Sequence, residues 1–354
     1  MNPGVTSSSE EFSCEKTGFE PRSSGVVRIG TRGSPLALAQ AEMVRNLLIA
    51  AYPALAEPGA IELIVIRTSG DRIQDRALAE IGGKGLFTKE IEEALLDGHI
   101  DMAVHSLKDV PTWMPEGLDI VCVLPREDPR DALFSAGGGG LENLPREAVV
   151  GTSGLRRQAQ VLSVRPDVKV VPLRGNVETR LRKLANGEVD ATLLAVAGLR
   201  RLGMQDRIQR VLEMDEMLPA VAQGAVGVEC RVEDIETRML LTPLHCQMTA
   251  ACVAAERAVL AELDGSCRTP IAAHARFDDE FRLELMALVG SPDGRRLFRT
   301  ARRGLTPVVV ARAAEAAGAA PETFDSALTI EAAALGADAG HELKEMLPPG
   351  FLAT

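Results

Sequence analysis

Arginine, lysine and hydroxyl side chains recur along this chain in groups that directly follow short apolar runs. Their members are Arg32, Ser34, Ser106, Lys108, Thr152, Ser153, Arg156, Arg157, Arg174, Arg180 and Arg201. Arginine forks bind carboxylates through paired hydrogen bonds, and hydroxyls and backbone N–H groups at helix starts bind carboxylates or phosphates. Because the whole chain is acidic, with a net charge of −11, the pattern favours a ligand with several anionic groups over scattered surface charge. The spacings match neither the dinucleotide nor the P-loop motif, so a nucleotide is not the favoured anion.

Asp109 is the one carboxylate within this cationic set, in the segment HSLKD. Two interpretations stay open. The side chain forms a simple ion pair with Lys108 or an arginine, or it faces a cationic or proton-exchanging group of a substrate. Basic neighbours favour the ionised form in both cases.

Cys267 lies in the segment LDGSCRTP, after a predicted helix and beside Arg268. Most intracellular cysteines are inert core residues, whereas a thiol on an exposed turn next to an arginine gains thiolate character. No histidine stands nearby to act as a base, so a protease-like role is unsupported. The residues alone leave an inert and a functional Cys267 equally open.

The stretch 70–85, GDRIQDRALAEIGGKG, is long for a connection between a strand and a helix. Its glycines would let it act as a hinged lid in which Lys84 reaches an anion. A plain flexible loop explains the same composition equally well.

Strand-like and helix-like segments alternate through the first two thirds of the chain, and these elements must position the side chains above. Strands are expected at 26–30, 61–67, 101–106, 148–153, 168–173, 190–197 and 224–231, and helices at 36–51, 87–96, 155–162, 177–184 and 198–202. This order predicts parallel pairing with right-handed crossovers. Ligands bind outside the carboxyl ends of such strands, which is where the polar groups fall.

The character of the chain changes near Cys246. A long Ala-rich helix is expected over 246–263, strands at 271–277, 282–290 and 295–303, and Ala-rich helices to the end. Turns such as SPDG indicate an antiparallel sheet with helices on one face.

The expected fold class is therefore α/β, with two α/β domains and a smaller α+β C-terminal domain that contains an antiparallel sheet. The expected boundaries are a disordered tail at 1–25, a first domain at 26–124 plus 224–242, a second at 125–223 and a third at 246–354.

Composition excludes several classes of protein. No apolar run approaches the ~20 residues of a membrane span, and the start of the chain does not read as a secretory signal. The acidic charge disfavours nucleic acid as a partner. Six cysteines without a CxxC motif favour free thiols in a reducing cytosol, and no histidine or cysteine spacing typical of zinc is present, so no metal is expected.

Nine motifs together resemble the porphobilinogen deaminase, or hydroxymethylbilane synthase, family. They are IGTRGSPLALAQA, GGKGLFTKEIE, DMAVHSLKDVP, REDPRDA, GTSGLRRQAQ, LRGNVETRL, LLAVAGLRRLG, LPAVAQGAVGVECR and LDGSCRTPIAA, in family order from about Val27 to Ala273. The resemblance implies two domains like the lobes of periplasmic binding proteins and a third domain that carries a cofactor. It implies a transferase of tetrapyrrole and heme biosynthesis, which joins four porphobilinogen molecules into hydroxymethylbilane and releases ammonia.

The resemblance also implies roles for individual residues. Cys267 would hold a dipyrromethane cofactor through a thioether, and Asp109 would be the catalytic carboxylate that assists the loss of ammonia. The cationic and hydroxyl set would bind the acetate and propionate groups of the pyrroles, and Lys84 falls in the matching lid loop. A monomer that works in the cytoplasm is expected.

Three positions depart from the family pattern. Gly154 replaces a frequent serine, Ala222 replaces a common glycine and would stiffen a hinge, and Ser266 replaces a frequent glycine. The alternative function is a solute-binding or effector-sensing protein of the same two-lobed fold. The chain shows no export signal and no DNA-binding segment, and neither alternative explains a third domain with Cys267.

Overall fold

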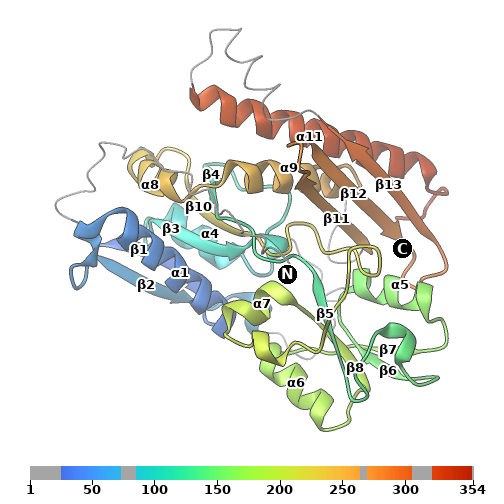
Figure 1. Cartoon of the computed structure of the whole chain (residues 1–354). Helices are drawn as coiled ribbons and strands as arrows, with labels where there is room; N and C mark the ends of the chain where they lie inside the picture. Colours follow the sequence, from blue (N-terminus) through green and yellow to red (C-terminus); the bar gives the residue numbers. More distant parts are fainter. Residues whose placement is uncertain (1–24, 73–84, 264–268, 305–320, 353–354) are drawn as a thin grey trace, which may run out of the picture.

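The computed structural model describes residues 25–72, 85–263, 269–304 and 321–352 of the chain (Figure 1). The predictions for the tail at 1–25, apart from its last residue, and those for Lys84 and Cys267 lie outside these residues. Within the described helices, none is long and apolar enough to cross a membrane.

The first sheet has five strands in the order β2-β1-β3-β10-β4. These are β1 (Val27–Arg32), β2 (Ile61–Ile66), β3 (Met102–Ser106), β4 (Leu118–Val123) and β10 (Val226–Arg231). β1 pairs in parallel with β2 and β3, as expected, but β10 is antiparallel to both β3 and β4. The helices of this unit are α1 (Pro35–Ala51), α2 (Ser69–Arg72), α4 (Lys89–Leu96) and α8 (Ile235–Leu241).

The second sheet also has five strands, in the order β7-β6-β8-β5-β9. These are β5 (Asp131–Ser135), β6 (Val149–Gly151), β7 (Lys169–Val171), β8 (Ala191–Ala195) and β9 (Arg210–Val211). β6 is parallel to β7 and β8, whereas β5 is antiparallel to β8 and β9. The helices are α5 (Leu155–Val164), α6 (Val177–Ala185) and α7 (Val196–Arg201).

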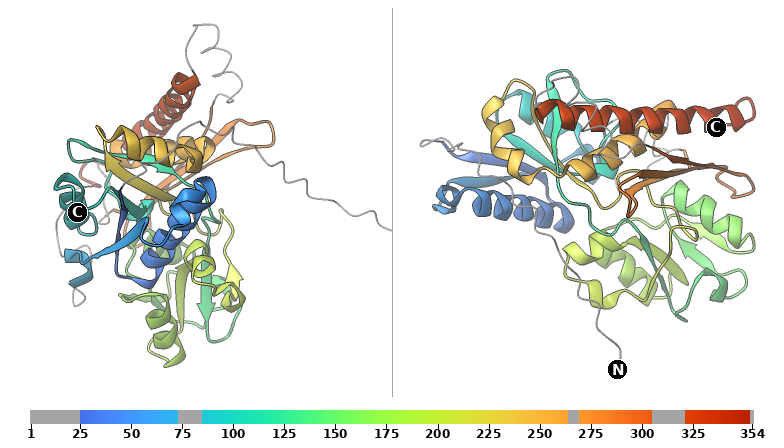
Figure 2. Two further views of the ribbon diagram at one scale, coloured as in Figure 1. Left: turned by 90° about the vertical axis from the view of Figure 1, so that its left-hand side faces the viewer. Right: turned by 45° about the horizontal axis from the view of Figure 1, so that its top comes forward.

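The third unit is a three-stranded antiparallel sheet, β11 (Ile271–Phe277), β12 (Leu283–Gly290) and β13 (Leu297–Arg303). Helices α9 (Gln247–Glu262) and α11 (Pro321–Met346) pack side by side and share a core with this sheet (Figures 1 and 2). Ala251, Ala255 and Ala339 are completely buried there, because small side chains allow two helices to approach closely. The expected fold class, two α/β units and a smaller α+β unit, is confirmed.

Strands β10 and β5 are antiparallel to their neighbours because of the way the chain crosses between the two α/β units. β10 begins with Val226 opposite Ser106, the last residue of β3. β5 begins with Asp131 opposite Ala195, the last residue of β8. Each crossing therefore enters its new sheet from the carboxyl ends of the parallel strands, which requires antiparallel pairing. The alternation of strands and helices in the sequence predicts only parallel pairing and does not reveal where the chain crosses between the units.

The two crossing segments touch at Gly224. Its φ is +88°, and a Cβ there would lie 2.3 Å from the Glu127 carbonyl oxygen, so only glycine fits. The Glu127 amide donates to the Gly224 carbonyl at 3.2 Å.

Strands β4, β5 and β9 and helix α8 were not expected from the sequence. In β5 the buried residues include a charged one, Asp131, which shortens the apolar run to three residues. Three apolar residues are too few to predict a strand, and the sequence does not show the partners that allow Asp131 to be buried.

Candidate active site

The parallel strands of the first unit bring their polar residues to one edge. Arg32 ends β1 and pairs with Ile66, the last residue of β2. Ser106 ends β3, which runs parallel to β1 on its other side. Ser34 caps α1 by accepting from the Ala37 amide at 3.2 Å. The carboxyl ends of β1, β2 and β3 thus form one wall of a site.

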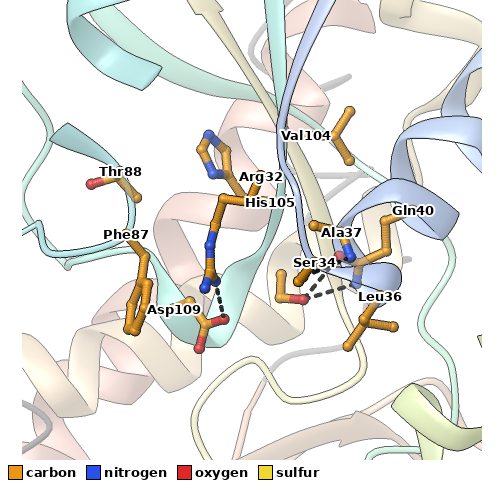
Figure 3. Close-up of a pocket in the computed structure, with 11 residues that line it drawn as sticks. Arg32, Ser34, Leu36, Ala37, Gln40, Phe87, Thr88, Val104, His105 and Asp109 are labelled. Atoms are coloured by element: carbon orange, nitrogen blue, oxygen red, sulfur yellow. Dashed lines mark hydrogen bonds and ion pairs between the residues drawn. The ribbon is translucent and has the colours of Figure 1, made fainter. Parts of the chain in front are cut away.

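Arg32 is the centre of this wall (Figure 3). Its Nη1 lies 3.7 Å from Asp109 Oδ2, and its Nε and Nη2 donate to the two oxygens of Asp71 at 3.2 and 2.5 Å. The guanidinium also stacks on Phe87, 4.1 Å from the ring centroid. The expected ion pair of Asp109 therefore exists, with Arg32 as the partner. Asp71 and Phe87 were missed because no spacing in the sequence connects them to β1.

Asp71 is held as a carboxylate. Burial alone would raise its pKa, but hydrogen bonds from Arg32 and Thr68 outweigh burial and lower the pKa of Asp71. Asp71 therefore keeps Arg32 oriented, and the guanidinium edge nearest Asp109 stays available to the cleft.

The hydroxyl of Ser106 lies beside Arg32, where the Gln40 side-chain amide donates to its Oγ at 2.8 Å. Ser34, Gln40, Ser106 and Asp109 line the same small pocket (Figure 3). Gln40 is buried on α1 and was not among the predicted site residues.

In the second unit, Arg156 and Arg157 are buried and share one carboxylate. Arg156 Nη2 donates to Asp131 Oδ2 at 2.7 Å, and Arg157 Nη2 donates to Oδ1 at 2.6 Å. Burial alone would raise the pKa of Asp131, but the two guanidinium groups outweigh it and lower that pKa. Both arginines line the cleft between the units, so Asp131 neutralises part of their charge. The sequence prediction assigned them to a ligand alone and missed Asp131.

Two further arginines of the second unit donate to backbone carbonyl groups at the cleft. Arg180 Nε donates to the Gly175 carbonyl at 2.9 Å, and Arg201 Nη2 donates to the Gly224 carbonyl at 2.7 Å. Burial lowers the pKa of Arg180 to about 10, and neighbouring Arg157 and Arg174 contribute. Arg174, Arg180 and Arg201 all line the cleft, as predicted from the strand ends.

These walls enclose one cleft of about 1710 Å3 between the two α/β units and the third unit. From the predicted set it is lined by Arg32, Ser34, Ser106, Lys108, Asp109, Ser153, Arg156, Arg157, Arg174, Arg180 and Arg201. Thr152 is buried and does not line it; its hydroxyl accepts from the Gly154 amide at 3.3 Å. The structure therefore gathers eleven of the predicted residues around a single volume, with Asp109 among cations.

Residues 27–239 match the family model described as porphobilinogen deaminase, dipyrromethane cofactor binding domain, and residues 250–320 match its C-terminal domain. This chain belongs to the porphobilinogen deaminase family. A chloroplastic porphobilinogen deaminase from Oryza sativa subsp. japonica is 52% identical over 326 residues, covering 92% of this chain and 85% of that protein. A porphobilinogen deaminase from Nitrobacter winogradskyi is 54% identical over 317 residues, covering 90% and 92%.

Among solved structures, an ancestral arginine-binding protein is 15% identical, with a TM-score of 0.34, and covers 62% of this chain and 91% of that one. A lipoprotein of the YaeC family from Enterococcus faecalis is 12% identical, with a TM-score of 0.35, and covers 63% and 93%. Because these TM-scores are low, the fold of this porphobilinogen deaminase family member is described from its own sheets and strand registers.

The cleft fits the cofactor of the porphobilinogen deaminase family. Dipyrromethane carries several carboxylates, and Lys108 is one of the cations that line the cleft. Lys108 is open to the cleft, but the walls of both units surround it. This burial lowers its pKa to about 8, with Arg157 and Arg156 contributing and Asp109 opposing. The Ser153 hydroxyl also lines the cleft and is buried with no hydrogen-bond partner within the described structure, so it is available to an acceptor.

The third unit reaches the cleft on both sides of the segment that contains Cys267. Leu260 and Ala261 of α9 line the cleft, and so do Thr269 and Ile271. Cys267 itself lies outside the described residues, as does Lys84.

A buried carboxylate joins the third unit to both crossing segments. Glu256 on α9 accepts from the Ala222 amide at 2.6 Å, from the Ala275 amide at 2.7 Å and from Arg126 Nη1 at 2.5 Å. Arg126 Nε in turn donates to the Gln223 carbonyl at 3.0 Å. Ala222, the departure from the family glycine, has a φ of +57° and is completely buried. The predicted hinge position is thus a left-handed one in which an L-residue is strained.

Proposed function

We propose that this chain joins four porphobilinogen molecules head to tail into hydroxymethylbilane, starting from a dipyrromethane bound to Cys267. The observation that carries the proposal is the Asp109 carboxylate, which lies among the cations of one cleft and makes only a long ion pair with Arg32. When bound, dipyrromethane would supply the free pyrrole α-carbon to which the first unit is joined, and each later unit would join the ring added before it. Each addition forms one carbon–carbon bond and releases one ammonia molecule.

The cations of the cleft would bind the acetate and propionate groups of the pyrroles. Arg32, Lys108, Arg174 and Arg180 line the cleft from opposite walls, so they can hold the two sides of one chain of rings. Arg156, Arg157 and Arg201 would contribute to the same binding, with Ser34, Ser106 and Ser153 as hydroxyl partners. Thr152 would act indirectly, because its hydroxyl holds the start of α5 through the Gly154 amide. Lys84 would contribute from the loop before α4.

Asp109 would act on the nitrogen atoms and the leaving group. Its carboxylate is exposed to the cleft and is 3.7 Å from Arg32 Nη1, an ion pair without short hydrogen bonds. One oxygen can therefore accept from a pyrrole N–H or from the ammonium group that leaves. A carboxylate in this place stabilises positive charge that develops as ammonia departs.

The division into domains follows the same proposal. The first domain would consist of 26–124 plus 224–242, the second of 125–223 and the third of 246–354. The position of β10 in the first sheet supports the return of the chain. Crossing segments that touch at Gly224 would let the cleft widen as the product grows.

Intact-mass measurement of the purified protein tests the proposal. We expect a mass that exceeds the sequence by two linked pyrrole units, and peptide mapping should place them on Cys267. Incubation with porphobilinogen should then release ammonia and yield hydroxymethylbilane. Active protein with an unmodified Cys267 would contradict the cofactor attachment, and failure to consume porphobilinogen would contradict the function.

We further propose that the enzyme is a monomer in the cytoplasm. The four described cysteines, Cys122, Cys230, Cys246 and Cys252, are free thiols, which suits a reducing compartment. Relatives include chloroplastic proteins, so cell fractionation is the direct test of location. Light scattering of the purified protein tests the oligomeric state, and a dimer mass would overturn the expectation.

A further inference from the structure

The segment that follows Asp109 is tied to a helix of the third unit. Arg257, on α9, donates from Nη1 to the Val110 carbonyl at 3.1 Å and from Nη2 to the Pro111 carbonyl at 2.5 Å. One planar guanidinium thus holds two successive carbonyl oxygens, a geometry that suits the rigid fork of arginine. Arg257 does not line the cleft, so its contacts are with the backbone that carries the site.

The position of the Asp109 side chain depends on this backbone. Among the described residues, its ion pair is the 3.7 Å contact with Arg32. The short helix that contains it, Leu107–Asp109, is fixed on one side where the Leu107 amide donates to the Ala225 carbonyl at 3.1 Å. Arg257 fixes the other side, directly after Asp109.

The same helix leads to the cofactor segment. Arg257 precedes Cys267 by ten residues, and the next turn of α9 presents Leu260 and Ala261 to the cleft. Helix α9 therefore contacts the backbone directly after Asp109 and, one turn later, lines the cleft. A displacement of about 1 Å between reacting groups costs roughly 10²-fold in rate.

We propose that Arg257 is a positioning residue, which sets the place of Asp109 relative to the cofactor-bearing third unit. The inference rests on the proposed roles of Asp109 and Cys267. Arg257 touches neither substrate nor cofactor, and it acts through the carbonyl groups of Val110 and Pro111.

The test compares holoenzyme variants whose cofactor content has been checked by intact mass. Arg257→Met keeps most of the side-chain volume and removes both hydrogen bonds. It should lower kcat by roughly 10- to 100-fold with little change in KM. Arg257→Lys keeps the charge and one donor, and it should recover part of kcat. If Arg257→Met does not fold, the comparison of Arg257→Lys with wild type remains decisive.

Val259→Ala is the matched control. Val259 is completely buried on the same helix, so its truncation should lower the thermal midpoint while the two hydrogen bonds from Arg257 stay in place. We expect wild-type kcat in Val259→Ala below its unfolding temperature. An equal loss of kcat in this control would show that Arg257 acts only through stability, and it would overturn the inference.

Trp113 supplies a local readout. It is the only tryptophan of the chain, follows Asp109 by four residues and lines the cleft. Time-resolved anisotropy of Trp113 should decay faster in Arg257→Met than in wild type or in Val259→Ala. Unchanged anisotropy would contradict a role in holding this segment.

A double variant separates the inference from the proposed function. In the Asp109→Asn background, Arg257→Met should lower the residual rate by less than about twofold, because its effect passes through Asp109. A full additional loss, or wild-type kcat in the single variant, would overturn the inference while leaving the function standing. Wild-type holoenzyme that does not consume porphobilinogen would instead overturn the function.

Discussion

Single residues in this cleft are defined by their partners as much as by their type. Asp71 orients Arg32, and Asp131 partly neutralises Arg156 and Arg157. Asp109 differs from both carboxylates, because its contact with Arg32 is a long ion pair and its side chain is exposed to the cleft. A carboxylate without tight protein partners remains free to interact with a substrate.

Replacement of Asp109 by asparagine tests this interpretation. Asparagine keeps the shape and removes the charge, so folding should be unchanged while kcat falls by roughly 10²–10⁴-fold, the usual range for a lost acid–base group. Steady-state kinetics and circular dichroism are the measurements. Asp71→Asn, which loosens Arg32 instead, should mainly raise KM. Wild-type turnover in Asp109→Asn would remove Asp109 from the mechanism.

Lys108 gives the cleft a pH dependence. Because burial and Arg157 lower its pKa to about 8, Lys108 is charged at neutral pH and loses its charge as pH rises through about 8. Its attraction for carboxylates weakens over the same range, so kcat/KM should fall on the alkaline side. Lys108→Arg should move this alkaline limb to higher pH. The exposed Lys89→Arg is the control, and an identical shift there would exclude Lys108 as the cause.

At the scale of elements, the antiparallel strands β5 and β10 complete their sheets and also place residues at the edge of the cleft. β5 and β10 both start at the cleft edge, opposite the last residues of β8 and β3. Asp131, the first residue of β5, thereby meets the first turn of α5 and fixes its two arginines. The chain crossing and the binding wall are thus built from the same residues.

Asp131→Asn should therefore destabilise the second unit. It leaves two buried guanidinium groups without their anion, a loss of roughly 3–5 kcal/mol for a broken buried ion pair. Because the pKa of Asp131 is lowered in the folded protein, its contribution is present at neutral pH and is lost as pH falls below the ordinary range of an aspartate. Urea unfolding measures the change. Asp293→Asn, at an exposed turn, should leave the midpoint almost unchanged, and similar midpoints for both variants would contradict the assignment.

Ala222 lies at the predicted hinge position, where the family resemblance implies a glycine. Ala222 carries a positive φ of 57°, which costs an L-residue roughly 1–2 kcal/mol. Its buried methyl group offsets part of that cost. The Ala222 backbone N–H donates a hydrogen bond to Glu256 Oε2 at 2.6 Å, so the third unit supports the strained position.

At the scale of the whole molecule, a net charge of −11 coexists with a strongly cationic cleft. Burial in the cleft lowers the pKa values of Lys108 and Arg180, and repulsion from neighbouring arginines adds to the effect. A ligand with several carboxylates would relieve this repulsion and would contact residues of all three units that line the cleft.

The cofactor-free variant Cys267→Ala should therefore unfold at a lower temperature than holoenzyme and respond more strongly to multivalent anions. Sulfate or phosphate should raise its thermal midpoint more than that of holoenzyme, because anions that bind the folded cleft stabilise it by mass action. Sodium chloride of the same ionic strength is the control for screening. Equal responses of the two proteins would contradict an uncompensated cationic cleft.

The sequence by itself determined the classes of element, the family and most of the cationic residues of the cleft. The periodicity of apolar residues and the polar groups that follow each apolar run are local features of the sequence. Local features can be recognised without knowledge of the fold. Residues such as Arg32, Arg174 and Arg180 could therefore be selected from the sequence.

Only the tertiary structure decided which charges meet. Asp71, Asp131, Glu256 and Arg257 reach their partners through strands and helices that are distant in the sequence. The antiparallel entry of β5 and β10 depends on where the chain crosses between units, which no local pattern encodes. Electrostatic partnership depends on distance in space and on burial, so the contrast between Asp131, bound by two arginines, and Asp109, open to the cleft, exists only in the folded molecule.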